Sequence, residues 1–144
     1  MSKPVFITMT TDIVSTEEEN EKYVFQTSGT MKKVKSAYYL RFDEVVEEAG
    51  TVHNTFKIED ERLTVLRQGP LSMRQQLEIG VETDGLYHTP FGTLPFSVEA
   101  KEISFTWDDE TLVGRLDYMY LMKLGSPSAR RHKVTVEMKG APEK

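Results

Sequence analysis

The chain of 144 residues has no cysteine and carries a formal net charge of −5 at pH 7. At this length one hydrophobic core is expected, and a hydrophobic content of 38% is too high for a disordered chain. The absence of cysteine excludes disulfides, thiolate nucleophiles and cysteine-ligated metal centres, and the negative charge disfavours general affinity for nucleic acid.

The first segments of the chain alternate apolar and polar residues, which is the pattern of strands. One face of the first segment carries Val5, Ile7 and Met9. The acidic residues 15–21 separate it from a second segment around Phe25. Ser15 and Glu18 fit a helix capping box, but no apolar run follows them, so we favour a hairpin loop.

The same alternation continues to the end of the chain. The residues that share the apolar face in successive segments are Tyr38, Leu40 and Phe42; Val52, Asn54, Phe56 and Ile58; Leu63, Val65 and Arg67; Leu71, Met73, Gln75, Leu77 and Ile79; Leu94, Phe96 and Val98; Ile103, Phe105 and Trp107; Leu112, Leu116, Tyr118, Tyr120 and Met122; and Val134, Val136 and Met138. If every second side chain faces one interior, these residues line it.

Glycine and proline predict where the strands bend or end. Gly29 lies inside a continuous strand pattern, which indicates a bulge or a sharp bend. Gly69-Pro70 should break a strand because proline has no backbone donor. Asp84-Gly85 is a favourable dipeptide for a type I′ hairpin turn.

About eight to ten strands joined by short connections predict an all-β fold, a single closed antiparallel up-and-down β-barrel. We expect a single domain over residues 1–144, with the barrel over about 4–139 and a loose C-terminal tail at 140–144. No segment approaches the length of about 20 apolar residues that a membrane span needs. The N-terminus shows no secretory signal, so we expect a cytoplasmic protein.

Several residues in the middle of the chain resemble the signature of the YwiB-like proteins, bacterial domains of unknown function. They are Arg67-Gln68-Gly69, Met73, Gln75, Gly80 and Tyr87-His88-Thr89-Pro90-Phe91-Gly92. The resemblance implies a calycin-like (lipocalin-like) barrel and no particular activity. The chain lacks the Gly-x-Trp of typical lipocalins in its first strand, since its one tryptophan is Trp107.

Three polar residues occupy the apolar face of their segments: Asn54, Arg67 and Gln75. An enclosed arginine must be paired or must face water or an anion. We therefore predict a ligand site in the barrel interior, formed by Asn54, Arg67 and Gln75 with the hydroxyls of Tyr118 and Tyr120. The alternative is that Arg67 pairs with a carboxylate of the protein or with carbonyls of the turn at Gly69-Pro70.

No pattern in the sequence indicates a metal, a cofactor or a catalytic group. His53, His88 and His132 lack the spacing of a metal site and are expected on the surface. The carboxylates lie in turns and on outward faces, and no nucleophile elbow or phosphate-binding loop is present. An enzyme is not excluded, but a role without catalysis is favoured.

The first functional hypothesis is therefore binding of a small anionic or amphipathic ligand inside the barrel, which fails if phenylalanines fill the interior. The alternative is an interaction or scaffold protein that works through its outer surface, with a protein partner or a second copy of itself. Two basic runs, residues 32–35 and 130–133, form one patch only if their strands adjoin. A hydrolase or isomerase ranks last, and we expect neither a membrane nor a nucleic acid as partner.

Overall fold

Ten strands account for most of the residues that the computed structural model describes, which are 2–15, 20–125 and 127–141. Their bounds are β1 (Lys3–Val14), β2 (Glu21–Val34), β3 (Ala37–Val46), β4 (Gly50–Glu59), β5 (Arg62–Gln68), β6 (Ser72–Glu78), β7 (Glu82–Thr89), β8 (Gly92–Asp108), β9 (Val113–Leu124) and β10 (Arg130–Gly140). The predicted all-β class is confirmed.

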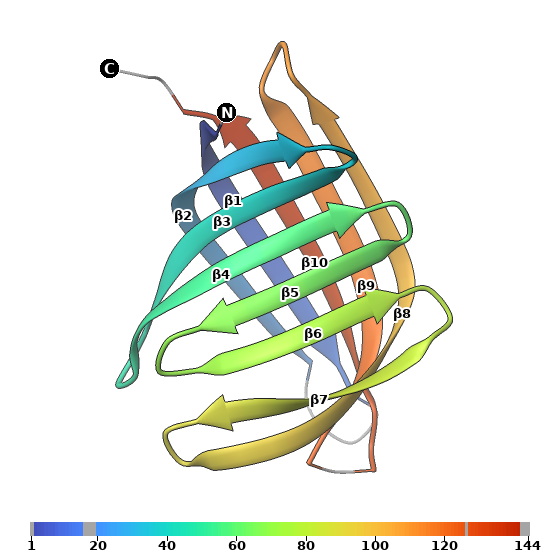
Figure 1. Ribbon diagram of the computed structural model, residues 1–144. Coiled ribbons are helices and arrows are strands. Elements are labelled where there is room, and N and C mark those ends of the chain that lie inside the picture. The colour runs from blue at the N-terminus through green and yellow to red at the C-terminus, as the bar shows by residue number, and fades with distance from the viewer. Residues whose placement is uncertain (1, 16–19, 126, 142–144) are drawn as a thin grey trace.

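Each strand pairs antiparallel with the next one in the chain, and β10 pairs with β1 to close the barrel (Figure 1). Short connections produce this arrangement because a hairpin can join only antiparallel neighbours. The predicted closed up-and-down barrel is confirmed, and its strand number over the described residues is at the upper end of the predicted range.

Apolar side chains fill the middle of the barrel. Its buried residues form one cluster that includes Ile7, Leu40, Phe56, Val65, Val98, Leu116 and Val136. Phe42, Phe56 and Phe96 are buried, and Phe25 and Phe105 are partly buried against the same cluster. The prediction of a ligand in the centre of the barrel is therefore wrong, because phenylalanines fill that space, which is the condition under which it fails. Only the ends of the interior remain as places for a site.

Strand β2 serves two neighbours and bends between them. It pairs with β1 as far as Met31 and with β3 from Gly29 onward, so the sheet folds over at Gly29. A Cβ atom at this position would collide with the carbonyl oxygen of Arg41. Glycine permits this close approach of two backbones, as the predicted bend requires.

The barrel wall is only weakly paired between β6 and β7. Ser72 pairs with His88 and Met73 pairs with Tyr87, after which the two strands separate. Beyond the separation Ile79 forms an isolated bridge to Ala100 of β8. Figure 1 shows β7 and the first part of β8 set apart from β6. A register shift in β8 between Ala100 and Glu102 accompanies this change of partner. Neither feature was predicted.

The predicted turn at Asp84-Gly85 is wrong. Both residues lie within β7, and the turn that precedes β7 is at Gly80, where φ is +78°. A Cβ at Gly85 would collide with the ring of Phe96, its cross-strand partner. Gly85 is thus needed for side-chain packing inside a strand. A rule that predicts turns from Asp-Gly cannot tell this use of glycine from its use in a turn.

The first two residues of the predicted C-terminal tail belong to the hydrogen-bonded barrel. Gly140 belongs to β10, and the backbone N–H of Ala141 donates to the carbonyl of Pro4 over 3.0 Å. The rest of the predicted tail, 142–144, lies outside the described residues. So do residues 16–19, which hold most of the predicted loop and Glu18 of the capping-box alternative. Within the described ranges, no helix is long and apolar enough to cross a membrane.

Candidate functional site

One end of the barrel carries the polar residues that the sequence singled out. At this end β1, β3, β5, β7 and β9 finish and the even-numbered strands from β2 to β10 begin, at the lower left of Figure 1. We call it the mouth. Inward-facing side chains there, such as Met9, Phe25 and Met73, are only half-buried, although they pack against the core. The mouth is thus a place where solvent meets the barrel interior.

All five predicted site residues face the interior and lie toward the mouth. Asn54 and Gln75 are 5% and 3% exposed, and they are polar residues within an otherwise apolar core. Tyr118 and Tyr120 are buried as well, and the side chain of Arg67 is 18% exposed. The alternation rule thus identified their orientation, while their role as ligand contacts stays a prediction.

Arg67 has protein partners. Its Nη2 donates to Glu44 Oε1 over 2.9 Å, and its Nη1 donates to the hydroxyl oxygen of Tyr87, also over 2.9 Å. The alternative interpretation, pairing with a protein carboxylate, is therefore confirmed. The acceptor is the carboxylate of Glu44 in β3 and not a carbonyl of the turn at Gly69-Pro70. Nε of Arg67 is nevertheless buried and has no hydrogen-bond partner.

Asn54 extends this network, and two further polar groups of the mouth form a pair of their own. Nδ2 of Asn54 lies 3.5 Å from Glu44 Oε1, at the outer limit of a hydrogen bond, so one carboxylate oxygen faces two donors. Gln75 forms a separate hydrogen-bonded pair with Tyr120. The network around Glu44 links β3, β4, β5 and β7, and the pair of Gln75 and Tyr120 links β6 to β9. Both hold their side chains in fixed positions.

Three rings stack from the core toward the mouth. Tyr118 and Tyr120 have ring centroids 5.9 Å apart, and Tyr120 and His132 have centroids 4.8 Å apart, each pair with planes 12° from parallel. Burial raises the pKa of Tyr118 well above its usual value and that of Tyr120 to about 12. Burial, aided by the positive charge of Arg130, lowers the pKa of His132 to about 4, against the opposing effect of Glu21. All three rings are therefore uncharged at pH 7.

The sequence analysis missed three residues of the mouth. It placed His132 on the surface, but this side chain is half-buried and stacked, whereas His53 and His88 are exposed as predicted. It also placed the carboxylates in turns and on outward faces, and Glu44 is an exception. Glu44 has the same parity as Leu40 and Phe42, so the alternation rule could have found it. Tyr87 lay within the family signature, but nothing in the sequence linked it to Arg67.

A second ion pair lies at the rim of the mouth. Nη2 of Arg130 donates to Glu21 Oε2 over 2.9 Å, joining the starts of β10 and β2. Along β1, Arg131 pairs with Val14 and Met31 pairs with Lys3, so the two basic runs lie at opposite ends of that strand. They are about 35 Å apart and do not form one patch.

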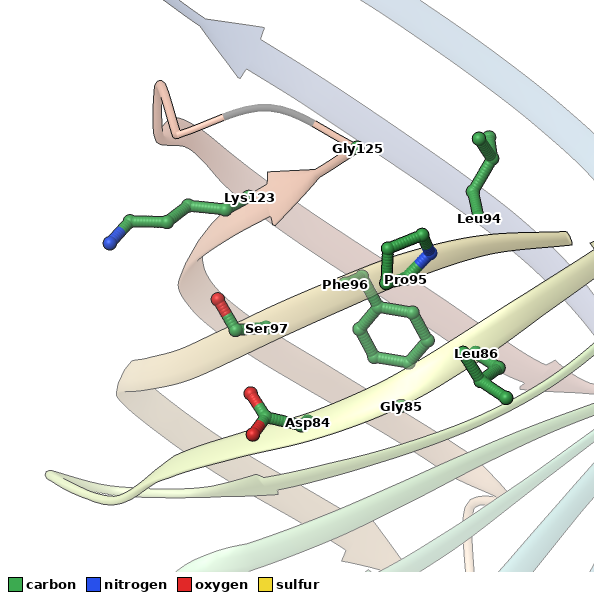
Figure 2. A pocket seen from close by; sticks show the side chains of 9 residues that line it. All are labelled: Asp84, Gly85, Leu86, Leu94, Pro95, Phe96, Ser97, Lys123 and Gly125. Carbon is green, nitrogen blue, oxygen red and sulfur yellow. The ribbon is translucent and has the colours of Figure 1, made fainter.

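The outer wall carries two open grooves that adjoin at β7. One, of about 790 Å³, lies over β7 and β8 near Gly125, and the ring of Phe96 is directed toward Gly85 beneath it (Figure 2). The other, of about 560 Å³, lies where β6 and β7 separate, and Arg67 and Met73 of the mouth line it together with the exposed Arg74. Phe91 at the tip of the β7–β8 hairpin is 93% exposed. A role for this outer surface stays a prediction.

No cluster of three potential metal ligands occurs among the side chains that the structure describes. In the mouth, the groups capable of binding are the guanidinium of Arg67, the amides of Asn54 and Gln75, and the rings. This set can accept an anion and an apolar or aromatic group. It offers no nucleophile with an adjacent base.

The comparisons with known proteins agree with the fold. The family model described as "Domain of unknown function (DUF1934)" matches residues 7–136. The uncharacterized beta-barrel protein YwiB of Bacillus subtilis (strain 168) is 26% identical over 141 residues, which cover 97% of each chain. The crystal structure of the ywiB protein from Bacillus subtilis has a TM-score of 0.87 at 25% identity, covering 98% of this chain and 94% of that one. Neither description names a ligand or a reaction.

Proposed function

Because the chain belongs to the family described as Domain of unknown function (DUF1934), we propose its function from the geometry of the mouth: it binds a small amphipathic anion there. The observation that carries the proposal is the state of Arg67. Its guanidinium is largely enclosed, yet Nε has no partner and Glu44 accepts from Nη2 through a single oxygen.

An anion of the right shape can use the guanidinium better than Glu44 does. Nε and Nη2 form a planar fork that matches the two oxygens of a carboxylate. Glu44 occupies one prong only, and its side chain, one-third exposed, lies near the end of β3. In the proposal a ligand carboxylate accepts from both donors while Glu44 turns toward solvent.

The walls of the mouth favour a ligand with an apolar part. Met9, Phe25 and Met73 are half-buried, so they present apolar surface that a ligand would remove from water. The filled middle of the barrel limits how deep such a ligand reaches, which favours a small one.

We propose a cytoplasmic location for this activity. The absence of cysteine supports it. Disulfides do not persist in a reducing compartment, and proteins that work there are stabilised by their core instead.

The test is to titrate the protein with decanoate and with decanol. Calorimetry measures the affinity of each, and NMR of the backbone amides locates the binding site. Decanoate is expected to bind and to shift amides near Arg67, and decanol, which has the same chain without the charge, to bind at least tenfold more weakly. The substitution Arg67→Gln should weaken decanoate binding about tenfold or more, because a hydrogen bond to a charged group contributes about 1.5–3 kcal/mol.

Arg62→Gln is the matched control, because it removes the same charge from an exposed residue at the start of β5, at the end of the barrel away from the mouth. It should leave decanoate binding unchanged. Equal affinities for decanoate and decanol in the unmodified protein would contradict the proposal without recourse to any variant, as would unchanged binding in a folded Arg67→Gln variant.

A further inference from the structure

The stack of Tyr118, Tyr120 and His132 has a direction. Tyr118 and Tyr120 are two positions apart in β9 and so share its inner face, and His132 is the partner of Tyr120 in β10. The centroid distance of 4.8 Å between Tyr120 and His132 equals the usual spacing of neighbouring strands, so the backbone itself sets the stack.

Only the last ring of the stack is accessible from the mouth. Tyr118 is 4% exposed and Tyr120 is 8% exposed, whereas His132 is half-buried. Beyond His132 the inner face continues with Ile13 in β1, its partner on that side, which is also half-buried. The core thus ends at the mouth in an imidazole ring and not in a closed aliphatic surface.

This ring is suited to contact another ring. Burial and the neighbouring Arg130 lower the pKa of His132 to about 4, so the imidazole is uncharged at pH 7 and is desolvated at lower cost than an imidazolium. Its orientation is held by Tyr120 on one face. Planar groups with complementary charge distributions stack on such rings with an advantage beyond the area that they bury.

The ring stack and the anion anchor belong to the same end of the interior. Gln75 hydrogen-bonds Tyr120, and Gln75 is the partner of Val65, two residues before Arg67 in β5. Against the larger effect of burial, the positive charge of Arg67 also lowers the pKa of both Tyr118 and Tyr120. A ligand held at Arg67 therefore has the rings within the same enclosure.

We infer that the mouth prefers aromatic carboxylic acids, with the carboxylate at Arg67 and the planar ring against His132. This inference rests on the proposed function for the anionic part and adds the chemical class of the rest of the ligand. Aliphatic acids of the same size would use the anchor alone.

The test compares two acids that share a skeleton. 2-Naphthoate is planar, and decahydronaphthalene-2-carboxylate has the same carbon framework and charge without aromatic rings. The unmodified protein should bind 2-naphthoate roughly 2- to 10-fold more tightly, which is the range that aromatic pairing provides. The side-chain protons of His132 should shift upfield by ring current with the aromatic acid only.

The substitution His132→Leu keeps an apolar side chain and removes the ring. It should lower the affinity for 2-naphthoate, so that the ratio of the affinities for the two acids falls to about one. Thermal unfolding of the variant checks that the barrel persists, and the comparison of the two acids in the unmodified protein needs no variant.

Equal affinities for the two acids, both lost in Arg67→Gln, would overturn the aromatic preference and leave the proposed function intact. Failure of both acids and of decanoate to bind would overturn the two together. A preference for 2-naphthoate that persists in His132→Leu would also overturn the inference, because the selecting ring would then lie elsewhere.

Discussion

Arg67 in β5 donates to Glu44 in β3 over 2.9 Å, although 23 positions separate them in the chain. Their strands are not neighbours, because β4 lies between them and contributes Asn54 to the same carboxylate. The pair therefore spans the inner face of the barrel. It satisfies an enclosed cation that would otherwise cost several kcal/mol.

Glu44→Gln should destabilise the protein by about 1 to 2 kcal/mol, because Arg67 would lose its counter-charge in a largely enclosed position. Urea unfolding at pH 7 measures the change. Glu78→Gln is the control: Glu78 pairs with Arg62 over 3.9 Å on the surface, where the expected effect is within about 0.5 kcal/mol. Similar losses in the two variants would contradict the structural role of the Glu44 pair.

Gly85→Ala should destabilise the barrel by about 1 to 3 kcal/mol, because the added Cβ collides with the ring of Phe96 and forces it from its place. A double-mutant cycle with Phe96→Leu measures the coupling. The second substitution removes the collision, so the Gly85→Ala cost should shrink in its presence. Additive effects of the two substitutions would show that the conflict lies elsewhere.

His132 should make stability fall in acid. Its pKa is about 4 in the folded protein against a usual value of 6.5, so the unfolded chain binds the proton more readily. The contribution is fully present above pH 6.5 and is lost as pH falls through 6.5 toward 4. Arg130, Glu21 and Tyr120 are the groups that face this ring.

Urea midpoints between pH 7 and pH 4 test this expectation, with His132→Phe as the comparison variant. The phenyl ring retains the stack and cannot be protonated. The variant should therefore lose stability less steeply with acid than the parent protein. Parallel pH profiles would indicate that His132 is no more buried than an exposed histidine.

Trp107→Ala should lower stability by about 3 kcal/mol. The ring packs against the core, lies over Gly114 of β9 and donates from Nε1 to Asp109 Oδ1 over 2.8 Å. Thermal and urea unfolding measure the loss. A change below about 0.5 kcal/mol would show that the ring contributes little despite its contacts.

Much of the fold could be predicted because alternation is a local property of the chain. Val5, Leu40, Phe56 and Leu116 revealed their inner faces through period-two patterns, and short connections then required hairpins. Prediction from local sequence failed where glycine had a use other than forming a turn. Gly85 resembled a turn residue but lies inside β7, because the ring of Phe96 occupies the space of a side chain.

Only part of the candidate site could be predicted from the same alternation pattern. Asn54, Arg67 and Gln75 were identifiable because each interrupts an apolar face. Their pairing was not, since Glu44 and Tyr87 reach Arg67 from other strands and His132 stacks on Tyr120 from the neighbouring strand. Which side chains meet across the interior depends on strand register and barrel curvature, and no stretch of sequence encodes either alone.

The sequence by itself determined the strands, their inner faces and the polar residues enclosed among apolar ones, because each of these depends on neighbours along the chain. Only the tertiary structure decided that the middle of the barrel is filled, that Arg67 is shared by Glu44 and Tyr87, and that three rings stack toward the mouth. Those features arise when closure brings distant strands together, and close packing then leaves one arrangement in which the side chains fit.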